Sequence, residues 1–169
     1  MSVTVTIRKG GPELIDRLEP LWLALHAHHQ SLNSDLKYFP DDRSWELRRS
    51  CYREWIRAEG SFVLIAERAA EPIGYAFVHI KPGPDDTWVT GARIAELETL
   101  SIAPAERGRG FGTLLLDAVD AELDKMGIGD LLIGTLIDNE GARRLYERRG
   151  LRPIMVYLAR FAASDHAGP

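Results

Sequence analysis

Residues 96–126 constrain the fold most: a strand-like segment is followed by a proline turn, three closely spaced glycines and a helical pattern. The glycines are Gly108, Gly110 and Gly112, and apolar side chains recur at helical spacing after them. Glycine lets backbone approach a ligand closely, and a helix start aims unpaired N–H groups and a positive dipole end at the loop before it. The stretch therefore predicts a strand, an anion-binding loop and a helix, although glycines at a helix start can also be purely structural.

Two common nucleotide motifs do not fit this loop. A Walker loop has Lys and then Ser or Thr after its last glycine, and Phe111 and Gly112 stand there instead. The dinucleotide fingerprint needs G-x-G-x-x-G, whereas the spacing here is G-x-G-x-G, and Asp138 comes too late to be its acidic residue. A different phosphate binder is indicated.

Length and charge narrow the function classes. We expect a single domain over residues 1–162 and a polar tail over 163–169, since 169 residues fit one core. The net charge of −4 does not favour a nucleic-acid partner. The single cysteine, Cys51, excludes an internal disulfide, and no apolar run approaches the roughly 18 residues of a membrane span. These features predict a cytoplasmic protein with no membrane partner.

Hydrophobic periodicity and turn residues predict alternating elements along the chain. We expect strands over 3–8, 61–67, 72–80, 93–102, 130–137 and 151–160, and helices over 13–29, 44–57, 110–126 and 139–149. Pro20 is expected to kink or divide the first helix, and Ser44 to cap the second. The strands of 61–80 should form an antiparallel hairpin, and those flanking the helix of 110–126 a parallel pair.

A second constellation lies on the predicted helix of 139–149. Asn139, Ala142 and Tyr146 fall near one another along one side, and Gly150 can end the helix. With Arg107, Gly110 and Gly112 of the loop, this pattern resembles the GCN5-related N-acetyltransferase superfamily, whose loop reads R-x-x-G-x-G and whose closing helix reads N-x-x-A-x-x-x-Y-x-x-x-G. The matching motifs cover residues 93–153, and the amino-terminal third matches only in layout.

The resemblance implies a fold, a donor and a reaction. The fold would be α/β (α+β), with a mixed, mostly antiparallel sheet of six to seven strands flanked by about four helices. The reaction would be direct acetyl transfer from acetyl-CoA to a primary amine of a small molecule or peptide, without a metal. The implied cofactor-binding residues are Leu100, Ser101, Ile102, Arg107, Gly108, Arg109, Gly110, Phe111, Gly112, Thr113, Asn139, Ala142 and Tyr146.

The resemblance also names catalytic candidates. Tyr146 corresponds to the family's general acid, which protonates the departing thiolate. For the base, Glu96 and Glu98 share a strand face by alternation, and the residues do not separate them; deprotonation through water is a further alternative. Thr99 stands where many relatives have an acidic residue, so that particular base does not carry over.

Other readings stay open at this point. A non-catalytic acyl-CoA-binding module would keep the loop without transferring the acyl group, and a homodimer is possible. Four aromatic residues can line the acceptor site but are more often core: Trp22, Tyr38, Trp45 and Trp88. His26, His28 and His29 are expected to be a polar helix end rather than metal ligands.

Overall fold

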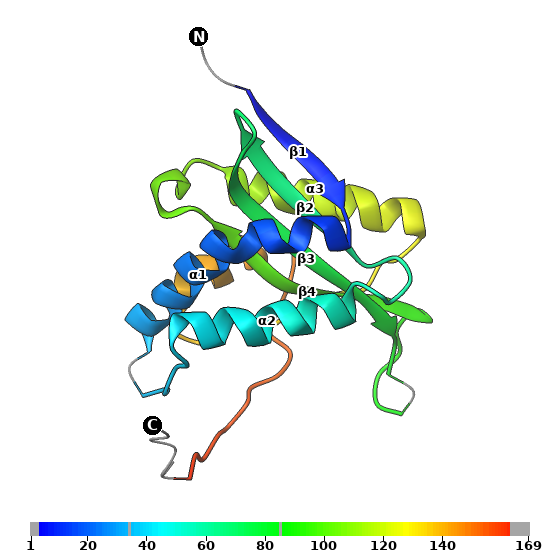
Figure 1. Ribbon diagram of the computed structural model, residues 1–169. Coiled ribbons are helices and arrows are strands. Elements are labelled where there is room, and N and C mark those ends of the chain that lie inside the picture. Colours follow the sequence, from blue (N-terminus) through cyan, green and yellow to red (C-terminus); the bar gives the residue numbers. More distant parts are fainter. Residues whose placement is uncertain (1–3, 34, 85, 163–169) are drawn as a thin grey trace.

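The computed structural model describes residues 4–33, 35–84 and 86–162 (Figure 1). The predicted polar tail of 163–169 and the first residue of the predicted strand at 3–8 lie outside these ranges. No helix within the described part of the chain is long and apolar enough to cross a membrane.

A five-stranded mixed sheet forms the centre of the molecule, in the order β1-β2-β3-β4-β5. Its strands are β1 (Val5–Gly10), β2 (Phe62–Arg68), β3 (Glu71–Pro82), β4 (Arg93–Ile102) and β5 (Leu131–Ile133). The first four pair antiparallel, and β4 pairs parallel with β5. This confirms the predicted hairpin and the predicted parallel pair.

Helices cover both faces of the sheet. The structure has η1 (Pro12–Leu18), α1 (Glu19–Leu32), α2 (Asp41–Trp55), η2 (Pro104–Glu106), α3 (Phe111–Met126) and α4 (Glu140–Arg148). Figure 1 shows α1 and α2 on one face and α3 on the other. The four α-helices of the described chain agree with the expected number.

The predicted division of the first helix at Pro20 is confirmed, whereas the predicted start of the second helix is wrong. The first helix is divided at Pro20, which lies in the opening turn of α1 after a 3-10 segment, because proline fits the first turn but not a helix interior. The second helix begins at Asp41 rather than at a Ser44 cap. The Ser44 N–H donates to the Pro40 carbonyl at 2.8 Å, and its buried hydroxyl accepts from Trp22 Nε1 at 3.1 Å.

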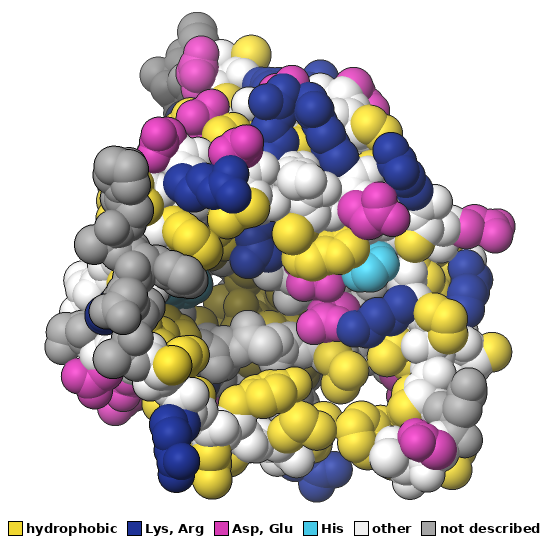
Figure 2. All heavy atoms as spheres, turned by 60° about the horizontal axis from the view of Figure 1, so that its bottom comes forward, with side chains coloured by type: hydrophobic (Ala, Val, Ile, Leu, Met, Phe, Trp, Pro, Cys, Tyr) yellow, Lys and Arg dark blue, Asp and Glu magenta, His cyan; other side chains and the backbone are white. Residues whose placement is uncertain are grey.

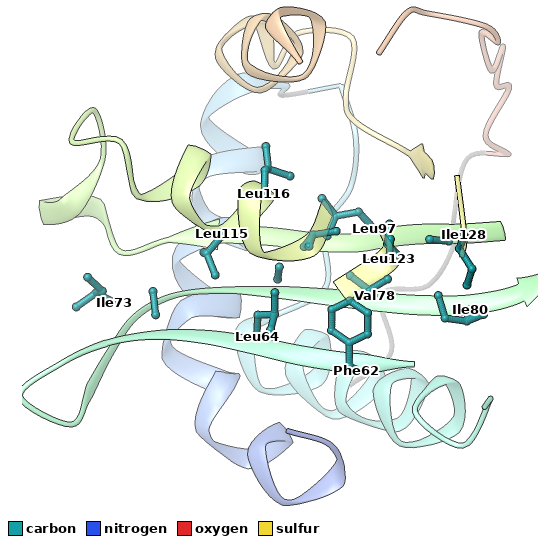
Figure 3. Packing of buried hydrophobic residues seen from close by; sticks show 14 residues of the cluster. Phe62, Leu64, Ile73, Val78, Ile80, Leu97, Leu115, Leu116, Leu123 and Ile128 are labelled. Atoms are coloured by element: carbon teal, nitrogen blue, oxygen red, sulfur yellow. The ribbon is translucent and has the colours of Figure 1, made fainter. Parts of the chain in front are cut away.

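Two apolar cores result, one on each face of the sheet. Alternation along β2 sends Phe62, Leu64 and Ala66 into the core under α3, and Val63 and Ile65 into the core under α1 and α2. Figure 3 shows leucines of α3 pointing onto the strands in the first of these cores. Both faces are thus fixed, so β3 and β4 are held rigidly between them.

A bulge in β4 opens the sheet. Phe77 pairs with Thr99 but Val78 pairs with Leu97, which leaves Glu98 as an extra residue in β4. The β4–β5 ladder covers only Ala95–Leu97, and the predicted strand of 130–137 shortens to Leu131–Ile133. The two neighbouring strands therefore stop pairing at the point where the bulge lies.

The predicted strand of 151–160 does not form in the described structure. A strand needs a neighbour for its ladder hydrogen bonds, and β5 offers only three residues before the chain leaves the sheet. The segment instead extends from the body (Figure 1) and exposes large apolar side chains, among them Ile154, Val156, Tyr157 and Leu158. This accounts for five strands where six to seven were expected. The homodimer remains a prediction.

Candidate active site

A cleft of about 330 Å³ lies where β4 and β5 separate. Figure 2 shows a hollowed face with apolar side chains inside and charged side chains near its rim. The lining comes from α1, α2, β4, the segment after β5, and α4: Trp22, Leu25, His29, Arg48, Leu97, Glu98, Thr99, Leu100, Ile133, Gly134, Thr135, Leu136, Asn139, Ala142 and Tyr146. The cleft thus brings residues of both halves of the chain together.

The glycine loop leads into α3, whose first turn lies against Leu145 of α4. Gly108 and Gly110 have φ of +71° and +85°, and a Cβ on either would meet nothing within 4 Å. Glycine is therefore favoured at both positions by the left-handed backbone and not by lack of room for a side chain. A Cβ at Gly112 would lie 3.2 Å from the Leu145 side chain, so this glycine lets α3 and α4 approach. The first-turn N–H groups of α3 have no acceptor within the helix.

The two loop arginines are held by the protein itself. Arg107 Nε donates to the Ile102 carbonyl at 3.1 Å, and Arg109 Nη1 lies 2.7 Å from Glu106 Oε2. Phe111 lies under the Arg109 guanidinium, 5.8 Å from ring centroid to Cζ. These contacts hold the loop in place. The Glu106 carboxylate also balances part of the positive charge of Arg109.

The end of β4 offers backbone rather than side chains. The Ser101 hydroxyl is buried and donates to the Leu21 carbonyl at 2.7 Å, while Leu100 and Ile102 pack against the core under α3. No β5 residue pairs with β4 beyond Leu97 in the described sheet. The main chain of 98–100 therefore faces the cleft along an unpaired edge, which can accept an extended ligand as a strand would.

The α4 residues point into the same cleft. The Asn139 side-chain oxygen accepts from the Ala142 N–H at 3.3 Å and caps the helix. Tyr146 packs beside the core under α3, and burial raises its pKa to about 12. Its hydroxyl has no hydrogen-bond partner among the described residues and is not sealed from solvent. A protonated phenol is thus available in the cleft at neutral pH.

The structure separates the two candidate bases. Glu98, at the bulge, lines the cleft and lies 3.2 Å from His79 Nδ1. Burial raises the pKa of the Glu98 carboxyl, and the negative charge of Glu96 adds to this effect. Glu96 lies outside the cleft lining and forms an ion pair with Lys81. Glu98 is therefore the better placed of the two.

Sequence reasoning missed the buried hydroxyl network behind Glu98. The Thr99 hydroxyl is hydrogen-bonded to the Tyr52 hydroxyl, which lies 2.9 Å from the Tyr75 hydroxyl. Burial raises the pKa of Tyr52 to about 12. Thr99 is thus a buried structural link between β4 and α2. No sequence signal could find this network, because its three residues lie on separate elements.

The wall opposite β4 comes from α1 and α2. Of the four aromatic candidates only Trp22 lines the cleft, whereas Trp45 is core, Trp88 is exposed, and Tyr38 donates its hydroxyl to the His29 carbonyl. Arg48 lines the cleft too and gave no signal in the sequence.

The three histidines have separate environments. His26 is buried, with Nε2 2.8 Å from the Phe39 carbonyl oxygen. His29 lines the cleft, and burial together with nearby positive groups lowers its pKa to about 4. The part of the chain that the structure describes holds no group of three side chains suited to a metal ion.

Comparison with known proteins decides the family. The model of the acetyltransferase (GNAT) family matches residues 23–151. The chain belongs to the acetyltransferase (GNAT) family. The match begins within α1 and runs through α4, so it includes the glycine loop and all of the cleft lining except Trp22.

Relatives extend this picture. A mycothiol acetyltransferase of Thermobispora bispora is 29% identical over 137 residues, which is 79% of this chain and 43% of that protein. The chain thus spans less than half the length of that relative. The BH1408 protein of Bacillus halodurans shares the fold with a TM-score of 0.76 at 19% identity, covering 93% of this chain and 99% of that one. An aminoglycoside N-acetyltransferase in complex with CoA has a TM-score of 0.68 at 17% identity, covering 97% and 98%.

Proposed function

We propose that this GNAT protein transfers an acetyl group directly from acetyl-CoA to a primary amine of a small molecule or peptide. The observation that carries the proposal is the cleft at the β4 bulge, which places Glu98 and Tyr146 in one lining. A carboxylate and a phenol are the acid–base pair that aminolysis of a thioester needs.

The chain's residues suit the donor. Open, left-handed Gly108 and Gly110 precede the start of α3, where free N–H groups and the helix dipole favour a pyrophosphate. The unpaired edge of β4 at 98–100 can hydrogen-bond a pantetheine arm. Acetyl-CoA supplies the thioester, and an N–H of this edge can stabilise the oxyanion that forms as its carbonyl is attacked.

Proton transfers complete the reaction. Glu98 accepts a proton from the acceptor ammonium. Its raised pKa lies closer to neutral pH than that of an ordinary carboxyl, which suits a general base. The amine nitrogen then bonds to the acetyl carbon as the carbon–sulfur bond breaks. Tyr146, a phenol that is protonated at neutral pH and whose pKa burial raises further, donates its proton to the departing thiolate. The nitrogen then gives its second proton to the resulting phenolate, which restores Tyr146. The products are the N-acetyl amine and CoA.

Thiol release from acetyl-CoA with a panel of amines tests this function. The similar proteins include mycothiol acetyltransferases and an aminoglycoside N-acetyltransferase. The panel should therefore include aminoglycosides and the acceptor of mycothiol acetyltransferases, besides amino acids and peptides. We expect turnover with at least one amine and a product heavier by one acetyl group. Tight CoA binding without turnover by any acceptor would instead support the non-catalytic acyl-CoA-binding module.

A further inference from the structure

Arg48 of α2 lines the cleft opposite β4. Its guanidinium carbon lies 4.2 Å from the ring centroid of Trp22, 5.5 Å from that of Trp55 and 5.6 Å from that of Tyr52. Three aromatic rings from two helices therefore hold a cation at one place in a half-buried site.

The N–H groups of the Arg48 guanidinium have no acceptor among the described residues. Within the described chain, no carboxylate lies within ion-pair distance of Arg48, and its N–H groups donate no hydrogen bond. Its neighbours on α2 differ: Arg43 pairs with Glu46 at 2.7 Å, and Arg49 and Arg53 pair with Asp16 at 2.7 and 3.3 Å. These three arginines lie outside the cleft lining and are paired, whereas Arg48 in the lining is not.

Contact with the aromatic rings does not use the hydrogen-bond donors of the guanidinium. Aromatic contacts engage the guanidinium, but its five N–H donors lie in its plane and still require acceptors. The fixed fork of these donors matches the two oxygens of a carboxylate or a phosphate. A partly desolvated arginine held in this way is an oxyanion site.

The other charges around the cleft fit such a ligand. Glu98 on β4 is the acidic side chain of the lining, and His29 on α1 has its pKa lowered to about 4, so it is neutral at pH 7. The cleft therefore has an anionic wall at Glu98 and a cationic wall at Arg48. A molecule with an amine and an oxyanion is complementary to both walls.

We infer that Arg48 binds an oxyanion carried by the acceptor, so that the acceptor is an amine with a carboxylate or phosphate group. This inference rests on the proposed acetyl transfer, since it assigns the acceptor's place in the same cleft. It also predicts poor use of polycationic amines, which would bring like charge to the guanidinium.

Paired acceptors test the inference. Amino carboxylates and amino phosphates are compared with their matched neutral amides and alcohols in the wild type, Arg48→Met, Arg48→Lys and Arg49→Met. Methionine keeps an apolar stem against Trp22 without the donors, and Arg49 is the matched control because it pairs with Asp16 on the outside. Both kcat/KM and the Kd of each compound for the CoA-saturated protein are measured, with CoA affinity as a folding check.

We expect the wild type and Arg49→Met to favour the anionic member of a pair by about 10- to 100-fold, the strength of a hydrogen bond to a charged group. Arg48→Met should lose this preference through KM and Kd, while its use of the neutral member and of CoA stays within about threefold. Arg48→Lys should restore part of it. Carboxylate and phosphate pairs show which oxyanion the site takes.

Equal Kd values for both members in the wild type, no measurable binding of either, or an unchanged preference in Arg48→Met would overturn the inference. Failure of the proposed function looks different: anionic compounds would bind through Arg48 while no amine released thiol from acetyl-CoA.

Discussion

The two walls of the cleft are built in different ways. The donor wall, formed by β4 in the cleft lining and by the glycine loop and α3 that follow it in the chain, is one contiguous segment. Backbone geometry shapes it, through a bulge at Glu98 and left-handed glycines at Gly108 and Gly110. The acceptor wall, formed by α1 and α2, depends on side chains such as Trp22 and Arg48 that meet only in the folded protein. A local segment can therefore bind a shared donor, while helices distant in sequence can vary the acceptor.

Removal of the Tyr146 phenol should have the largest effect. We expect Tyr146→Phe to lower kcat about 100-fold, the contribution of a general acid, with CoA affinity changed by less than about twofold. Steady-state thiol release measures this effect. Tyr157→Phe is the control, because Tyr157 is 88% exposed outside the cleft. An unchanged kcat in Tyr146→Phe would mean that Tyr146 of α4 is not the general acid.

A substitution in the loop tests the backbone character of the donor wall. At Gly110, φ is +85°, and an alanine there should cost about 1–2 kcal/mol or move the loop. We expect Gly110→Ala to weaken CoA binding about tenfold in calorimetric titration. Gly129→Ala is the control, since its backbone is not left-handed and a Cβ there meets nothing within 4 Å. Equal affinities in the two variants would contradict the role of the loop.

The buried hydroxyl network tests what supports the acceptor wall. Tyr52→Phe leaves the Thr99 and Tyr75 hydroxyls without a common partner, so we expect a loss of about 1–3 kcal/mol in the free energy of unfolding. Urea unfolding measures it, with Tyr157→Phe again as the control. CoA affinity should persist in the folded variant. If instead stability is unchanged and CoA binding is lost, the two walls are not independent.

The smallest expected effect is a pH dependence of stability. Because the pKa of Glu98 is raised in the folded state, its contribution to stability is present below its ordinary value of 4.5 and is lost as pH rises through the raised value. Glu98→Gln cannot lose a proton, so its Tm relative to wild type should rise from pH 4.5 toward neutrality. A thermal series over pH measures this difference. A relative Tm that falls with pH would mean that the carboxylate is stabilised in the fold.

Sequence predicted the donor wall well because its information is local. The strand, glycine loop and helix of 93–126 and the helix that follows Asn139 are predicted by residue spacing and glycine chemistry. The bulge at Glu98 is not visible in the sequence, since it arises from the register between β3 and β4. The convergence of Arg48, Trp22 and Tyr52 is likewise set by tertiary packing.

The carboxyl-terminal segment is a case in which the sequence predicts an element that the described structure does not form. Residues 151–160 are mostly apolar, as in a buried strand, but β5 ends at Ile133 and gives them an edge of only three residues in the described structure. Strand propensity depends on a neighbour, and a neighbour is not a property of the segment itself.

The most direct test of the central claim, that the bulge places Glu98 as the base, is the pH dependence of kcat/KM in the wild type, Glu98→Gln and Glu96→Gln. We predict that wild-type activity falls with decreasing pH as Glu98 becomes protonated, and that Glu96→Gln keeps an acidic limb. Glu98→Gln should be slow throughout and lack that limb. Loss of the limb in Glu96→Gln with its retention in Glu98→Gln would contradict the claim.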